Sequence, residues 1–77
     1  MIRLAVVGAS GRMGRLISDI ADGLDDVQVV QRIGSADALE FAPEVDAVVD
    51  VTLPQVSPAV VRAATDAGLP VLVGTSG

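Results

Sequence analysis

The sequence predicts an α/β fold, in which an open parallel sheet of about four strands has helices on both faces. Three observations predict it. Short runs of almost continuously apolar residues recur along the chain, as in strands that are buried on both faces. Segments with apolar residues at helical spacing separate these runs, and turns rich in Gly and Pro interrupt them. With 77 residues, the chain allows one small domain, which we assign to residues 1–77.

The first half of the chain predicts a strand, a helix and a second strand. The run Ile2–Val7 (IRLAVV) ends at Gly8 and predicts a strand buried on both faces. The helix follows the glycine turn and ends at Asp25-Asp26. Val27–Arg32 (VQVVQR) predicts the second strand. One face of the helix is expected to be buried, because its apolar residues share helical spacing: Met13, Leu16, Ile17, Ile20, Ala21 and Leu24.

The second half predicts a short helix within 35–41, a strand at 47–52 (AVVDVT), a helix, and a strand at 71–74 (VLVG). Ser57-Pro58 favours a helix start, because Ser can cap free N–H groups and Pro at the first helical position wastes no donor. Gly68 suits the left-handed position after the helix, and Pro70 cannot continue it. The buried stripe of this helix is expected to consist of Val60, Val61, Ala64 and Ala67.

The connection between the second and third strands decides the expected order of the sheet. It is too short to hold a further strand with its own helix, so we expect the chain to cross the first strand and give the order 2-1-3-4. The order 3-2-1-4 is the alternative. In the preferred order the first and third strands flank the point where ligands bind, at the carboxyl ends of the strands.

Composition excludes several classes of function. The chain has no Cys, His or Lys, so disulfides, thiolate or imidazole metal sites, catalytic triads and Schiff-base chemistry are ruled out, and no metal is expected. The net charge of −5 and the single aromatic residue, Phe41, argue against nucleic-acid binding. No apolar run approaches the roughly 20 residues of a membrane helix. Since there is also no signal-peptide pattern, we expect a cytoplasmic protein that binds no membrane.

A glycine-rich loop, Gly8-Ala-Ser-Gly11-Arg-Met-Gly14, joins the first strand to the first helix. Gly8 permits a tight turn, Gly11 leaves a pyrophosphate room to approach the backbone, and Gly14 allows the helix to pack closely. The helix N-terminus adds free N–H groups and partial positive charge, and Arg12 and Arg15 add full charges. The loop therefore predicts a dinucleotide site, with a tight turn that binds nothing as the alternative. A Walker A loop is excluded because it requires Lys.

The sequence leaves NAD and NADP open as the cofactor. Dinucleotide-binding folds place an acid at the end of the second strand, where it binds the ribose hydroxyls. Here Gln31-Arg32-Ile33-Gly34 occupies that position, and the nearest acid is Asp37. Arg32 facing a 2′-phosphate would favour NADP, but a solvated charge at the strand end is the preferred interpretation.

Other candidate residues follow the third and fourth strands. We expect the strand ends at Gly8, Thr52 and Gly74 to converge, with Thr75 and Ser76 beside them. Their hydroxyl and N–H groups would suit a nicotinamide ribose or carboxamide, although such residues are also ordinary turn formers. A buried Asp50 would need a partner, and a helix N-terminus is favoured over a titrating role. Met13 is expected in the core rather than as a lid over the cofactor.

Three segments together resemble the N-terminal half of dihydrodipicolinate reductases: Gly8-Ala-Ser-Gly-Arg-Met-Gly-Arg15, Val49-Asp-Val-Thr-Leu-Pro54 and Val73-Gly-Thr-Ser-Gly77. The family usually shows GAxGRMGR, D-F-T-x-P and V-x-G-T-T-G, so Val51 and Ser76 are departures. The resemblance covers the whole chain. It implies a Rossmann-like domain that binds NAD or NADP in an oxidoreductase of the diaminopimelate route to lysine. The cofactor-binding residues that it implies are Gly8, Ala9, Ser10, Gly11, Arg12, Met13, Thr52, Gly74, Thr75 and Ser76.

The resemblance also implies that an intact family member is an NAD(P)H-dependent reductase. Its catalytic His and Lys residues, substrate site and tetramer interface belong to a second domain that these residues do not contain. We therefore assign no catalytic residue and expect the 77-residue chain alone to be inactive. A non-catalytic nucleotide-binding module and the cofactor domain of another Rossmann dehydrogenase are the alternatives. We also expect self-association through the edge of the sheet formed by 71–74.

Overall fold

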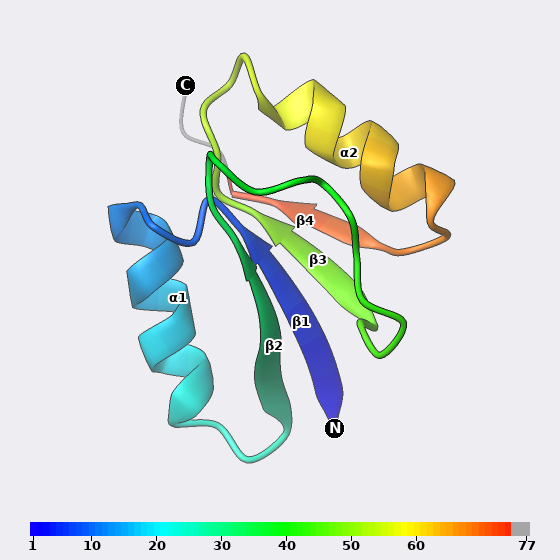
Figure 1. The fold of residues 1–77 in the computed structure, drawn as a ribbon. Coiled ribbons are helices and arrows are strands. Elements are labelled where there is room, and N and C mark those ends of the chain that lie inside the picture. Colours follow the sequence, from blue (N-terminus) through cyan, green and yellow to red (C-terminus); the bar gives the residue numbers. More distant parts are fainter. Residues whose placement is uncertain (75–77) are drawn as a thin grey trace.

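A computed structural model describes residues 1–74 of the chain. Its elements run in the order β1 (Ile2–Val7), α1 (Arg12–Asp22), β2 (Val27–Ile33), β3 (Ala47–Asp50), α2 (Ser57–Asp66) and β4 (Val71–Val73). Figure 1 shows α1 on one side of the sheet and α2 on the other. The predicted α/β class is confirmed. Within residues 1–74, no helix is both long and apolar enough to cross a membrane.

The sheet has four parallel strands in the order β2-β1-β3-β4, which confirms the preferred topology. Because β1 lies between β2 and β3, the chain must cross it, and residues 34–46 make that crossing over the α2 side of the sheet (Figure 1). All four strands point the same way. The loops after β1, β2 and β3 therefore meet at the carboxyl edge, which is the edge that the topology assigns to a ligand.

The second half of the central strand β1, Ala5–Val7, is buried on both faces as predicted, whereas Ile2 and Arg3 at its start are exposed. Successive side chains of a strand point to opposite faces. Ala5 and Val7 accordingly join one core cluster with Val60 and Ala64 of α2, whereas Val6 joins a second cluster with Ala21 of α1. The two-sided core fixes β1 firmly, and with it the position of the glycine loop that follows.

The predicted buried face of α1 is partly wrong. The helix packs through Gly14, Ser18 and Ala21, whereas the larger apolar residues along its flank are half exposed: Met13, Leu16, Ile20 and Leu24. At Gly14 no larger side chain would fit, because a Cβ there would lie 2.3 Å from the carbonyl oxygen of Gly8. Met13 is 47% exposed, so the expectation that it belongs to the core is also wrong.

The short helix predicted within residues 35–41 is wrong, because this segment forms turns and extended chain. The side chain of Gln31 on β2 stabilises this non-helical conformation. Gln31 donates to the carbonyl oxygen of Glu40 at 2.7 Å and accepts from the N–H of Ala42 at 3.0 Å. Leu39 and Phe41 pack on the core from this segment. Side-chain hydrogen bonds thus replace those that a helix would have supplied.

The predicted helix α2 is confirmed, but its start and its buried stripe differ in detail. Val56 is the N-cap residue, so Ser57 and Pro58 are the first two helical residues and Ser57 does not cap the helix. The buried stripe is Ser57, Val60 and Ala64, while Ala67 is exposed. Gly68 follows the helix at a φ of 71°, the left-handed conformation expected there.

Candidate functional site

A cleft of about 360 Å³ lies at the carboxyl edge of the sheet, over the ends of β1, β2 and β3. Residues from the loops after β1, β2 and β3 line it, so these three loops meet as the sheet topology predicts. The walls are mainly apolar, with a few polar groups, which is typical of small-molecule sites. The described lining residues are Val7, Gly8, Ser10, Gly11, Ile33, Gly34, Ser35, Asp37, Leu39, Val51, Thr52, Leu53 and Val56.

Gly8 and Gly14 shape the glycine loop by allowing backbone to approach backbone. Gly8 has a φ of 90°, and a Cβ on it would lie 2.8 Å from the carbonyl oxygen of Val51. A Cβ on Gly14 would lie 2.3 Å from the carbonyl oxygen of Gly8 and 2.6 Å from Cα of Ala9. The predicted tight turn at Gly8 is confirmed, whereas Gly14, expected to let the helix pack close to the sheet, instead packs against the loop itself.

Gly11 differs from these two glycines because almost nothing in the protein faces it. The one described atom within 4 Å of a Cβ built there is the carbonyl oxygen of Gly8, at 3.5 Å, an ordinary contact. Its backbone is extended, with a φ of −81°, so neither strain nor crowding demands glycine here. The open space above Gly11 lies beside the cleft and would admit a group from outside the protein.

The N-terminus of α1 points backbone donors toward that open space. The first intrahelical donor is the N–H of Arg15, which bonds to the carbonyl oxygen of Gly11 at 3.0 Å. The N–H groups of Arg12, Met13 and Gly14 precede it and therefore have no partner within the helix. Neither a capping side chain nor an acid in the first turn competes for them. This end of α1 carries partial positive charge and suits an anion such as a phosphate.

Asp50 at the end of β3 is fully buried and holds Thr52, a lining residue of the cleft, in place by hydrogen bonds. One carboxylate oxygen accepts hydrogen bonds from the N–H and the hydroxyl of Thr52, at 3.0 and 2.5 Å. The other accepts from the hydroxyl of Ser57, in the first turn of α2. The expectation that Asp50 faces a helix N-terminus is confirmed. Thr52 itself lines the cleft, and because its hydroxyl donates its proton to Asp50, the hydroxyl oxygen is left with acceptor capacity.

Asp37 is the only charged residue among the described lining residues of the cleft. The chain turns after β2, and the N–H of Gly34 donates to Oδ2 of Asp37 at 2.8 Å. The N–H of Asp37 in turn donates to the carbonyl oxygen of Gly34 at 3.1 Å. The sequence alone gives no means to place this acid in the cleft.

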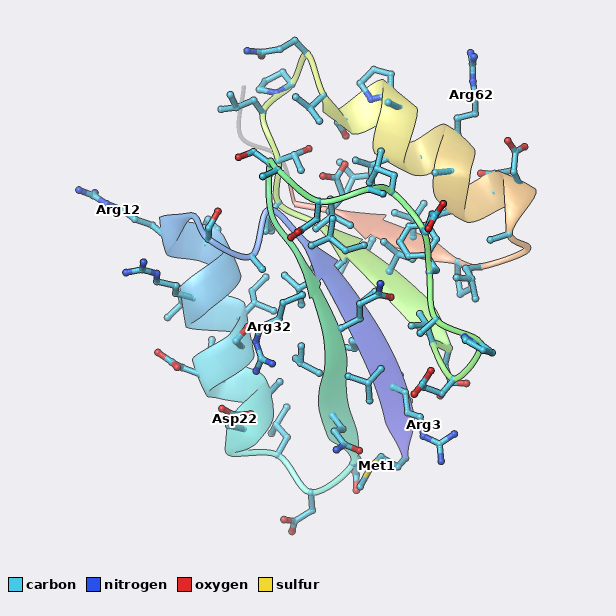
Figure 2. The ribbon with its side chains drawn as sticks, in the orientation of Figure 1. Met1, Arg3, Arg12, Asp22, Arg32 and Arg62 are labelled. Atoms are coloured by element: carbon cyan, nitrogen blue, oxygen red, sulfur yellow. The ribbon has the colours of Figure 1, made fainter. Side chains whose placement is uncertain are left out.

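The structure gathers only part of the predicted site. Gly8, Ser10, Gly11 and Thr52 line the cleft, whereas Ala9, Arg12, Met13 and Gly74 are not among its described lining residues. Figure 2 shows Arg12 projecting away from the sheet and Arg32 lying alongside α1. Arg32 is exposed and also does not line the cleft, which agrees with the preferred interpretation of a solvated charge.

Gly74 lies at the end of β4, where its N–H donates to the carbonyl oxygen of Asp50 at 2.8 Å. It therefore lies next to Asp50, which binds Thr52, and is not itself among the described lining residues of the cleft. Thr75 and Ser76 lie outside the described residues. Leu39, Leu53 and Val56 also line the cleft. The sequence does not predict this, because apolar residues in loops carry no signal of their own.

Comparison with known proteins gives one consistent result. The family model described as "Dihydrodipicolinate reductase, N-terminus" matches residues 2–77. Among curated proteins, a 4-hydroxy-tetrahydrodipicolinate reductase of Clavibacter michiganensis is 50% identical over 74 residues, which cover 96% of this chain and 27% of that protein. A protein of the same name from Beutenbergia cavernae is 39% identical over 77 residues, which cover 99% of this chain and 31% of that protein. The chain thus spans about 30% of the length of these relatives.

Proposed function

The chain belongs to the dihydrodipicolinate reductase family, and from that premise we propose that it binds a reduced nicotinamide dinucleotide, NADH or NADPH. The single observation that carries the proposal is the open space above Gly11, beside the free N–H groups of α1. A Cβ there meets one described atom, at 3.5 Å, in a loop whose other two glycines are tightly packed. A glycine that the fold does not require is explained when a ligand needs the space.

The residues present fit such a cofactor. Gly8–Met13 would hold the pyrophosphate, because the free N–H groups of the loop and of α1 donate to phosphate oxygens. Thr52 would accept a hydrogen bond from the nicotinamide half, since its hydroxyl proton is already used on Asp50. Gly74, Thr75 and Ser76 are proposed to complete that half. The bound dinucleotide would supply a hydride, and this chain would bind and orient it.

We further propose that this dinucleotide serves the reduction that the relatives' name describes, 4-hydroxy-tetrahydrodipicolinate reduction in lysine and diaminopimelate biosynthesis, in the cytoplasm. Hydride transfer to a substrate needs a proton donor and groups that hold the substrate. The 77 residues contain no His or Lys for either role. The proposal therefore assigns catalysis and substrate binding to a further domain, and cofactor binding to residues 1–77.

A pair of variants at one position tests the proposal. Gly11→Val should fold normally, because the extended backbone accepts Val and no described atom crowds the site. It should nevertheless lose dinucleotide binding by at least about tenfold, since a branched side chain would fill the approach path of the pyrophosphate. Binding is measured by the change in nicotinamide fluorescence. The chain has no Trp or Tyr, so protein emission does not interfere.

Gly23→Ala is the control for the general effect of replacing a glycine. Gly23 caps the end of α1 at a negative φ of −87°, far along the helix from the loop, so its replacement should keep the fold and leave dinucleotide binding unchanged. Equal affinity of the unchanged chain and of Gly11→Val for NADH and for NADPH would refute a pyrophosphate site at the loop. Thermal unfolding followed by circular dichroism verifies that all the proteins are folded.

A further inference from the structure

We propose that Asp37 selects the cofactor, so that this chain binds NADH in preference to NADPH; the proposal rests on the proposed function and deepens it. The question arises because the position that usually carries the ribose-binding acid, at the end of the second strand, holds Ile33-Gly34 here. A chain without an acid at that position would be expected to discriminate weakly between a ribose and its 2′-phosphate. The turn after β2 changes that expectation.

Asp37 lies beyond the end of β2 in the sequence, but the turn brings its carboxylate back to that strand end. The N–H of Gly34 donates to Oδ2 of Asp37 at 2.8 Å, and the N–H of Asp37 donates to the carbonyl oxygen of Gly34 at 3.1 Å. Two reciprocal hydrogen bonds therefore fix the carboxylate over the end of β2. A carboxylate oxygen that accepts one N–H keeps further acceptor capacity, and Oδ1 has no described partner.

Asp37 also lies close to the loop that would hold the pyrophosphate. Oδ2 of Asp37 and Oγ of Ser10 are within 3.4 and 3.6 Å of the same point, the place that a Cβ on Gly34 would occupy. Gly34 therefore leaves open the space between the acid and the glycine loop. In dinucleotide sites, the adenine-side ribose lies between the second strand and that loop. Its two adjacent hydroxyls would donate to the carboxylate of Asp37.

Charge then decides between the two cofactors. Asp37 is the only charged residue among the described residues that line the cleft, and no Arg of residues 1–74 joins it there. Arg32, the nearest candidate in sequence, is exposed and lies alongside α1 (Figure 2). A 2′-phosphate would bring close to two negative charges against the carboxylate without a cation to balance them. A free 2′-hydroxyl would instead make a hydrogen bond to a charged acceptor.

Titration of the chain with NADH and with NADPH, followed by nicotinamide fluorescence, tests the proposal. We expect the unchanged chain to bind NADH about tenfold more tightly than NADPH, the effect of one charge-assisted hydrogen bond. Asp37→Asn keeps an acceptor for the N–H of Gly34 and so preserves the turn, but it removes the charge. It should weaken NADH binding, strengthen NADPH binding and bring the affinity ratio close to one.

Glu40→Gln is the matched control, because it removes one negative charge from the same connection at an exposed residue that does not line the cleft. It should leave the affinity ratio unchanged. Equal binding of both dinucleotides by the unchanged chain, tighter binding of NADPH, or the same ratio in Asp37→Asn would overturn the role of Asp37 while leaving dinucleotide binding intact. Failure of the unchanged chain to bind either dinucleotide would instead overturn the proposed function, and this proposal with it.

Discussion

At the scale of single residues, the three loop glycines have different physical reasons to be glycine. Gly14 is required by the fold, because a Cβ there would lie 2.3 Å from the carbonyl oxygen of Gly8. Gly8 combines a φ of 90° with a similar backbone contact. Gly11 has neither constraint. The sequence predicts all three as parts of a ligand loop, but only the structure separates two glycines that shape the loop from one that leaves room for a ligand.

This distinction predicts opposite results for two Gly→Ala substitutions, one in α1 and one at its C-cap. Gly14→Ala should lower the free energy of unfolding by about 1–3 kcal/mol, the usual cost of forcing a methyl group into a packed site. Gly23→Ala should raise it by about 0.4–1 kcal/mol, because its negative φ accepts Ala and the unfolded chain loses freedom. Urea unfolding followed by circular dichroism measures both. A Gly14→Ala protein as stable as the unchanged chain would show that α1 can move away from the loop at no cost.

The site residues were predictable to the extent that a local pattern encodes them. Gly8 and Gly11 stand in a recognisable loop, and Thr52 follows an apolar strand, so their position in the cleft could be anticipated. Asp37 could not be placed, because its location depends on hydrogen bonds to Gly34 that bend the chain back. Arg12 is the opposite case: the motif predicts it as a site residue, but its side chain projects away from the sheet (Figure 2). The motif does not determine where this side chain points.

At the scale of elements, the strands and long helices follow from local patterns, and the errors lie where tertiary contacts override them. The predicted short helix at 35–41 competes with Gln31, whose side chain binds the backbone of Glu40 and Ala42. The apolar spacing of α1 correctly predicts a helix. It does not predict which flank is buried, because the buried residues of α1 are the small Gly14, Ser18 and Ala21, and at Gly14 the backbone of the glycine loop leaves no room for a side chain.

Two buried serines with the same exposed fraction, 8%, give a test of how the helices are anchored to the sheet. Ser57 on α2 donates to the buried carboxylate of Asp50, whereas the hydroxyl of Ser18 on α1 has no described partner. Ser57→Ala should destabilise the fold by about 1.5–3 kcal/mol, the usual value for a hydrogen bond to a charged group.

Ser18→Ala should stabilise the fold by about 0.5–1 kcal/mol, because it removes an unpaired buried hydroxyl and Ala favours the helix. Both free energies come from urea unfolding of the same preparation, so that each variant is the control for the other. If both substitutions change the free energy of unfolding by the same amount and with the same sign, the hydrogen bond from Ser57 to Asp50 contributes no more to stability than the unpaired hydroxyl of Ser18.

At the scale of the whole molecule, the sheet order was predictable because the length of one connection decided it. The exposed surface was less predictable. Leu72 and Val73 on β4 are 69% and 47% exposed, and within residues 1–74 no strand pairs with the outer edge of β4. Pro70 and Gly74, which flank β4, exchange backbone hydrogen bonds with Val48 and Asp50 of β3. Backbone groups alternate in direction along a strand, so those of Val71 and Val73 point outward.

This edge predicts that the 77-residue chain self-associates. Outward N–H and C=O groups beside exposed apolar side chains are a template for a second chain, and the net charge of −5 opposes contact only weakly at ordinary salt. Multi-angle light scattering at moderate salt should therefore show a mass above the monomer value of 7.8 kDa that rises with concentration.

Leu72→Lys should shift the mass toward the monomer, because a charged side chain on an edge strand disfavours pairing. Arg62→Lys is the control, since Figure 2 shows Arg62 projecting from α2 and the substitution keeps its charge. A mass of one chain at every concentration would mean that this edge does not recruit a partner. A Leu72→Lys protein that associates as strongly as the unchanged chain would place the contact elsewhere on the molecule.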